Sequence, residues 1–249
     1  MPVHVVRRAS GLPVLAAVTV LSVVGCAADP GKRAPEPAPS SAPPSVSALP
    51  PAYRPLTAEQ LVAAALPAGA GPDSYGNPVS VRKNVRGSSP EPESSDPACA
   101  ELFAAAHARH VSRPTPVVAE QTFNWKGGEG GDNGGNSTLA SYGATGAQDA
   151  FRLVTQGLST CHSYESQGPG RTYDWTITFG AAPHLGNEAV QFEATAPTES
   201  GPLKTRYTVV RTGSVVATFT KRVAGDLDMP AFPPDLIAQQ ISLLQQAQS

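Results

Sequence analysis

The chain has little charge, few aromatic side chains and almost no cysteine. Of its 249 residues, 15% are charged, 6% are aromatic and three are cysteines. The net charge of −2 is dispersed, so the basic stripe typical of proteins that bind nucleic acid or anionic lipid is missing. The apolar run at 11–24 is shorter than the roughly 20 residues that a transmembrane helix needs. We therefore expect no nucleic-acid partner, and no membrane-spanning helix in that run.

The motifs of common catalytic and metal sites are missing too. No Gly-x-Ser-x-Gly sequence is present, and Glu188 and Glu193 are five apart in an expected strand, so they point to opposite faces. His107 and His110 lie three apart in an expected helix, but no further ligand follows at a zinc-protease spacing. The stretch 127–135 forms neither a complete calcium repeat nor a phosphate loop, and we interpret it as a hairpin loop. We expect no catalytic residue, metal site or cofactor.

The N-terminus carries the most informative pattern. Arg7 and Arg8 precede the apolar run, which ends in Val23-Val24-Gly25-Cys26. A basic start, a short apolar stretch and a small residue at the cut are typical of a secretory signal. The last four residues resemble a bacterial lipobox, whose cysteine takes a diacylglyceryl group and becomes the mature N-terminus. We predict a lipoprotein signal peptide at 1–25 and a lipid on Cys26; the alternative is an ordinary signal peptide with an incidental cysteine.

A tether and one domain are expected after the leader. Residues 26–52 are rich in proline, alanine and serine, a composition that stays extended because it cannot bury enough apolar area to fold. Removal of Arg7 and Arg8 with the leader changes the net charge from −2 to −4. Residues 53–249 are enough for a single domain with a core of its own. The predicted location is the outer face of the cytoplasmic membrane, with the lipid as the contact to it.

The remaining cysteines, Cys99 and Cys161, form an even pair. In an exported protein such a pair predicts a disulfide, and the alternative is two buried thiols. A nucleophilic Cys161 is disfavoured, because it falls on the apolar stripe of a helix, where cysteines are usually inert.

Hydrophobic periodicity predicts an α+β protein with an antiparallel sheet of about six strands packed against two or more helices. The clearest helix has apolar residues spaced four and three apart between Ala147 and Cys161, and the clearest strand alternates between Tyr173 and Phe179. A capping box at Thr57–Gln60 opens a short helix, and Asp96-Pro97 opens another. Further strands are expected at 116–125, 136–142, around Val190–Ala194, at 204–211 and at 215–222, with a possible one near 79–81 and a final helix at 235–247.

Aromatic residues concentrate in the expected sheet. They are Tyr142, Tyr173, Trp175 and Phe192, with Trp125 at the end of an earlier strand. Core packing is the first interpretation, and a cleft for an apolar or amphipathic ligand between the sheet and helix layers is the second.

The order of several short motifs resembles a known family, the PknH-like extracytoplasmic sensor domain of actinobacterial lipoproteins. The matching segments are Leu56-Thr57-Ala58-Glu59-Gln60-Leu61, Cys99-Ala100-Glu101-Leu102, Ser141-Tyr142 leading into 147–161, Leu185-Gly186-Asn187-Glu188-Ala189 and Val209-Val210-Arg211-Thr212-Gly213. Asn187 stands where the family usually has aspartate, and a second disulfide of the kinase domains has no counterpart. The resemblance implies an α+β domain with a cleft that senses or binds something outside the cell, with no catalytic residue and no known ligand.

We therefore expect a lipid-anchored, non-catalytic ligand-binding or sensing module. Its ligand is an unknown small or apolar molecule, or a protein of the cell envelope. The alternatives are an interaction or structural lipoprotein without a small ligand and, third, an enzyme of the cell envelope. Because the chain has no kinase portion, signalling would need another protein.

Overall fold

The computed structural model describes residues 53–70, 80–82, 95–110, 112, 115–124, 134–168, 170–224 and 232–249. The predicted leader, the lipidation site Cys26, the tether at 26–52, Trp125 and most of the loop at 127–135 lie outside these ranges. All that follows concerns the expected domain.

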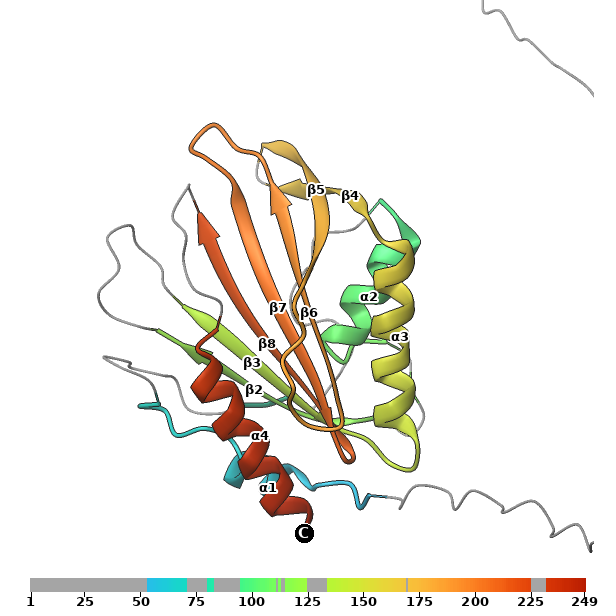
Figure 1. The fold of residues 1–249 in the computed structure, drawn as a ribbon, viewed down its shortest axis with the longest axis vertical. Coiled ribbons are helices and arrows are strands. Elements are labelled where there is room, and N and C mark those ends of the chain that lie inside the picture. Colours follow the sequence, from blue (N-terminus) through green and yellow to red (C-terminus); the bar gives the residue numbers. More distant parts are fainter. Residues whose placement is uncertain are drawn as a thin grey trace, which may run out of the picture. The chain divides into compact units, whose positions relative to one another are not determined.

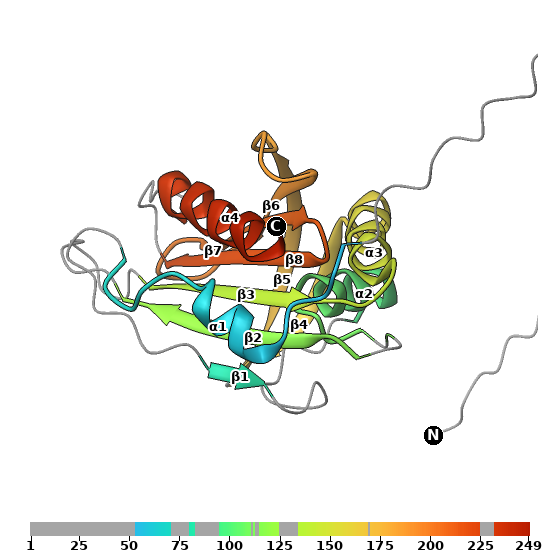
Figure 2. The same cartoon turned by 90° about the horizontal axis from the view of Figure 1, so that it is seen from below.

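Eight antiparallel strands of the described part form one sheet, in the order β1-β2-β3-β8-β7-β6-β5-β4 (Figure 1, with β1 labelled in Figure 2). The strands are β1 (Ser80–Arg82), β2 (Val117–Phe123), β3 (Gly135–Ser141), β4 (Ser163–Gly168), β5 (Arg171–Gly180), β6 (Glu188–Ala196), β7 (Leu203–Thr212) and β8 (Val215–Ala224). The α+β class and the antiparallel sheet are confirmed, but the sheet has eight strands where about six were expected.

The strand missing from the expectation is β4, at one edge of the sheet. Its sequence is polar, and only Tyr164 and Ser166 are buried. Ser166 faces inward because its hydroxyl accepts a hydrogen bond from the indole Nε1 of Trp175, at 2.8 Å. Two inward residues are too few for hydrophobic alternation to reveal a strand.

One face of the sheet is covered by α1 (Ala58–Ala63) and α4 (Pro234–Gln248), and we name it the α1/α4 face. The predicted capping box of α1 is confirmed, since Thr57 and Gln60 each bond the other's backbone N–H. Ile237, Ile241 and Leu244 of α4 pack on the apolar side chains of β7 and β8. The glutamine-rich side of α4 is mostly exposed, with the buried Gln240 as an exception.

The opposite face is covered by α2 (Pro97–Ala106) and α3 (Gly146–Thr160), and we name it the α2/α3 face. These two helices lie together, away from α1 and α4 (Figure 1, Figure 2). The carboxylate of Asp96 caps α2 by accepting from the backbone N–H groups of Ala98 and Cys99 at 2.7 and 3.2 Å. The helices pack closely at Gly157, where an added Cβ would lie 2.7 Å from the Cβ of Leu102.

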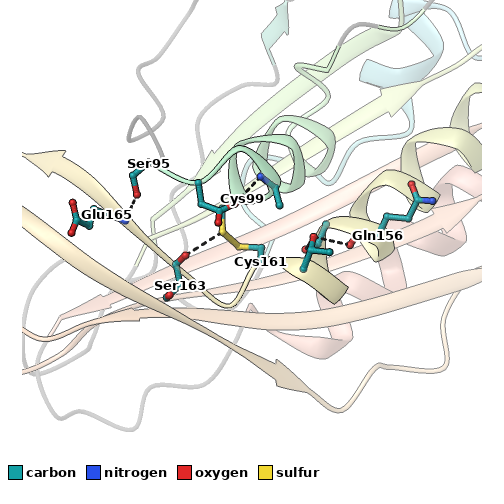
Figure 3. The surroundings of a disulfide bond; sticks show 10 residues. Ser95, Cys99, Gln156, Cys161, Ser163 and Glu165 are labelled. Atoms are coloured by element: carbon teal, nitrogen blue, oxygen red, sulfur yellow. Dashed lines mark hydrogen bonds between the residues drawn. A yellow bond between two sulfur atoms is a disulfide. The ribbon is translucent and has the colours of Figure 1, made fainter. Parts of the chain in front are cut away.

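A disulfide between Cys99 and Cys161 joins the start of α2 to the end of α3 (Figure 3). Both residues are fully buried, and 62 positions separate them in the sequence. The chain-entropy model gives such a cross-link about 4 kcal/mol of stabilisation. The predicted pairing is thus confirmed, and a free Cys161 nucleophile is excluded in this structure.

The β4 edge beside the disulfide is partly covered. The backbone N–H of Ser95 donates to the carbonyl of Glu165 at 3.1 Å, and the N–H of Glu165 donates to the hydroxyl of Ser95 at 3.0 Å (Figure 3). An edge engaged in this way is protected from pairing with another chain. Among the described helices, none is both long and apolar enough to cross a bilayer.

Candidate ligand-binding cavity

A cavity of about 200 Å³ lies on the α2/α3 face, beyond the C-terminal end of α2. The residues that line it are His107, Gly134, Asn136, Tyr164, Trp175, Ala194, Thr205, Tyr207, Thr220 and Arg222. They come from α2 and from β3 to β8, and strand pairing places Asn136 opposite Thr220 and Thr205 opposite Arg222. The site is therefore built by the tertiary fold and by no single segment.

Aromatic rings form one side of the cavity. Tyr164 stacks on Trp175 with ring centroids 6.0 Å apart and planes 7° from parallel, and Tyr207 stacks on Phe192 at 4.6 Å. Because the indole N–H of Trp175 already donates to Ser166, the indole offers its carbon surface to a ligand. Tyr164 and Trp175 are only 6% and 5% exposed, so this side of the cavity consists of packed core side chains.

The end of α2 contributes His107 through an unusual backbone conformation. The backbone N–H of Arg109 donates to the carbonyl of Ala104 at 2.6 Å, and the backbone N–H of Ala108 donates to the carbonyl of Ala105 at 3.1 Å. These two hydrogen bonds are the pattern of a Schellman motif. Ala108 occupies its left-handed position with φ of 53°, where glycine is usual. This end of α2 directs the ring of His107 edge-on to Tyr207, at 5.9 Å.

Polar side chains form the other side of the cavity. The side chains of Thr205, Thr220 and Arg222 make no hydrogen bond or ion pair with other residues of the described ranges. Asn136 accepts a hydrogen bond from Thr122 on its Oδ1, at 2.9 Å, which leaves its Nδ2 amide as a donor. None of the lining residues in the described ranges is acidic, so Arg222 gives this side a positive charge.

A larger hollow of about 380 Å³ lies over β5, β6 and β7 around Gln191, Glu193 and Arg206. Its charged groups neutralise one another, because Arg206 Nε lies 2.5 Å from Glu193 Oε2. The amide of Gln191 also donates to the hydroxyl of Thr208, at 3.1 Å. With its polar groups engaged in this way, the hollow offers a ligand less than the aromatic cavity does.

The two histidines of the α2 region face different rings. While His107 contacts Tyr207, His110 stacks on Tyr142 at 5.8 Å. Burial lowers the pKa of His110, against a smaller opposing effect of its hydrogen bond with the Ala104 backbone. Within the described ranges, no three His, Cys, Asp or Glu side chains are close enough to share a metal ion.

The motif 185–189 lies at the opposite end of the sheet from the cavity. Asn187 accepts a hydrogen bond from the N–H of Gly213, at 2.7 Å, in the hairpin between β7 and β8. The N–H of Asn187 donates to the carbonyl of Arg211 at 2.8 Å, and Glu188 pairs with the guanidinium of Arg211. These residues hold the hairpin and have no place in the cavity.

The first described residues also dock at this hairpin. The hydroxyl of Ser214 donates to the carbonyl of Arg54 at 2.9 Å, and the N–H of Ser214 donates to Gln248 at the end of α4, at 2.8 Å. Arg222 lies eight positions after Ser214 along β8, a distance of about 26 Å in an extended strand. The chain thus enters the domain at the end remote from the cavity.

Sequence reasoning found part of the cavity. It singled out Trp175 as a core or cleft residue and His107 as one of a pair of histidines without a metal site, but it assigned no ligand-binding residue. It missed Tyr207 and Arg222, although both strands were predicted and alternation could have grouped Tyr207 with Thr205, and Arg222 with Thr220.

Comparison with known proteins gives no assignment. No protein-family model and no curated protein match the sequence. Among solved structures, an X-ray structure of an uncharacterized protein from Mycobacterium smegmatis, the Rv0999 ortholog, is similar to this chain. The similarity covers 71% of this chain and 88% of that one, with 12% sequence identity and a TM-score of 0.36. A TM-score this low does not establish a shared fold.

Proposed function

We propose that this protein is a lipid-anchored, extracytoplasmic module that binds a small ligand without transforming it. The observation that carries the proposal is the cavity, in which a buried aromatic side faces Thr205, Thr220 and Arg222, whose side chains make no hydrogen bond or ion pair within the described ranges. Apolar surface with a few convergent polar groups is the usual composition of a ligand site. Among the described residues of the lining, His107 has no cysteine, serine or carboxylate beside it that could serve as a nucleophile or an acid.

The proposed anchor is a lipid on Cys26, followed by the tether at 26–52. The disulfide supports export, since such bonds persist in oxidising compartments. Because the first described residues dock at the β7–β8 hairpin, attachment from that side leaves the cavity accessible. A sensor domain of the PknH-like family, suggested by the motif order, fits this arrangement.

The anchor is tested by replacing its cysteine. Cys26→Ala is expected to move the protein from the membrane fraction to the soluble fraction, with the unaltered protein as the control that keeps the anchor. A Cys26→Ala protein that stays in the membrane fraction would refute the lipid anchor.

Ligand binding is tested by native mass spectrometry of residues 27–249, exported from an actinobacterial host behind a cleavable leader. We expect an added mass that is lost on denaturation and whose fragmentation identifies the ligand. A purely apo mass, unchanged after incubation with envelope extract, would favour the alternative of an interaction lipoprotein without a small ligand.

A further inference from the structure

We propose that the cavity binds a small organic anion, with its charged group beside Arg222 and an apolar ring against Trp175 and Tyr164. This inference rests on the proposed ligand-binding function and adds the chemical class of the ligand. It follows from the charge, the hydrogen-bonding groups and the size of the cavity.

The charge of the lining is positive because acidic residues of the same strands point away. Asp174 directly precedes the lining residue Trp175, and Glu193 directly precedes the lining residue Ala194. Because side chains alternate along an extended strand, both carboxylates point to the other face of the sheet. Glu193 is also paired there with Arg206. Among the described residues of the lining, the guanidinium of Arg222 therefore has no carboxylate beside it.

The hydrogen-bonding groups near Arg222 complete a site for an anion. Thr220 lies next to Arg222 on the same face of β8, and the amide of Asn136 lies opposite Thr220 on β3. Thr205 lies opposite Arg222 on β7. Hydroxyl and amide groups donate to carboxylate, sulfate or phosphate oxygens, and a guanidinium binds such groups through two parallel N–H bonds. A cationic ligand would meet Arg222 at close range and lose affinity.

The aromatic side and the size of the cavity define the rest of the ligand. The stacked pair Tyr164 and Trp175 is almost fully buried and lines the cavity with aromatic carbon atoms. Sites for drug-sized ligands usually measure about 300–1,000 Å³, so a cavity of about 200 Å³ admits a smaller molecule. One ring with a short acidic arm satisfies both conditions.

Three probes separate charge from ring. Phenylacetate has both groups, phenethylamine has the ring with a positive charge, and acetate has the charge alone. Each is titrated into ¹⁵N-labelled residues 27–249 with the disulfide intact, and backbone amide shifts are followed by NMR. We expect phenylacetate to shift the signals of Asn136, Ala194 and Thr205, with a Kd at least tenfold below those of the other two probes.

A matched pair of arginine variants tests the assignment to Arg222. Arg222→Gln is expected to raise the Kd for phenylacetate at least tenfold, since the hydrogen-bonded ion pair between the guanidinium and the carboxylate is lost. Arg171→Gln, at an exposed arginine that lies over Tyr173 and outside the cavity lining, is expected to change the Kd less than twofold. Equal effects of the two variants would overturn the assignment.

The outcomes distinguish this inference from the function on which it rests. Phenethylamine binding in the cavity as tightly as phenylacetate would overturn the anionic class and keep the ligand-binding function. No shift at the cavity with any probe would also overturn it, and native mass spectrometry then decides the function separately. If native mass spectrometry also detects no ligand, both the anionic ligand class and the ligand-binding function are refuted.

Discussion

The buried Gln240 of α4 gives the sharpest prediction about stability. Its side chain is fully buried and bridges α4 to the segment after α1, where Oε1 accepts from the N–H of Leu66 at 3.0 Å. Its Nε2 donates to the carbonyl of Ala64 at 2.6 Å. One amide thus satisfies a donor and an acceptor at the end of a short helix, where backbone groups lack intrahelical partners.

Replacement of Gln240 by leucine keeps most of the volume and removes both hydrogen bonds. Ala64 and Leu66 are 5% and 1% exposed, so water cannot easily replace the lost partner. Each orphaned group costs about 1–3 kcal/mol, and the added apolar side chain returns roughly 1–2 kcal/mol. We expect Gln240→Leu to lower the free energy of unfolding by about 1–4 kcal/mol.

Urea unfolding of the oxidised chain measures this change, with Gln239→Leu as the matched control. Gln239 is the preceding residue of the same helix and is exposed, so its variant is expected within about 0.5 kcal/mol of the parent. With a urea slope near 2 kcal/mol/M, the Gln240→Leu midpoint should fall by about 0.5–2 M. Equal midpoints for the two variants would show that the bridge contributes nothing and would refute the reasoning.

Three further predictions concern the disulfide, the backbone and pH. Cys99→Ala and the double variant Cys99→Ala/Cys161→Ala should each have a free energy of unfolding about 4 kcal/mol below that of the parent, measured in urea, because both remove the same disulfide. A decrease twice as large in the double variant as in the single variant would contradict this. Ala144→Gly should stabilise by about 0.5–1 kcal/mol, because Ala144 is exposed at a φ of 48°, whereas Ala108→Gly should be near neutral because it also removes a buried methyl. The lowered pKa of His110 means that its neutral form is favoured by folding, so stability should be full above about pH 6.5 and fall as pH decreases through the folded-state pKa. His110→Gln should reduce that decline in urea midpoints between pH 7.5 and 5, and an unchanged decline would exclude His110 as its source.

Much of the fold was predictable because it has local causes. The capping box at Thr57, the apolar stripe from Ala147 to Cys161 and the alternation of Tyr173 to Ile177 each depend on neighbouring residues. The alternation was expected to continue to Phe179, but that side chain is 62% exposed. β4 was not predicted because the burial of its Ser166 depends on a hydrogen bond from Trp175 of the neighbouring strand β5.

The cavity was less predictable because no local pattern specifies it. Tyr207 and Arg222 line the cavity because β7 pairs with β8 and because both strands lie close to the end of α2. A threonine or arginine on an exposed strand end has the same local sequence whether it faces water or a ligand. Only strand order and register bring such residues together.

The motif 185–189 shows why a resemblance of motifs need not extend to the ligand. Gly186 adopts a φ of 61°, and an added Cβ would lie 2.5 Å from the carbonyl oxygen of Arg211, so glycine is required by packing. Asn187 uses a side-chain oxygen to accept from Gly213, a bond that an aspartate could make equally well. The exchange of aspartate for Asn187 therefore preserves the hairpin and leaves the cavity untouched. Because the hairpin and the cavity lie at opposite ends of the sheet, proteins that share this motif can differ at every residue that would contact a ligand.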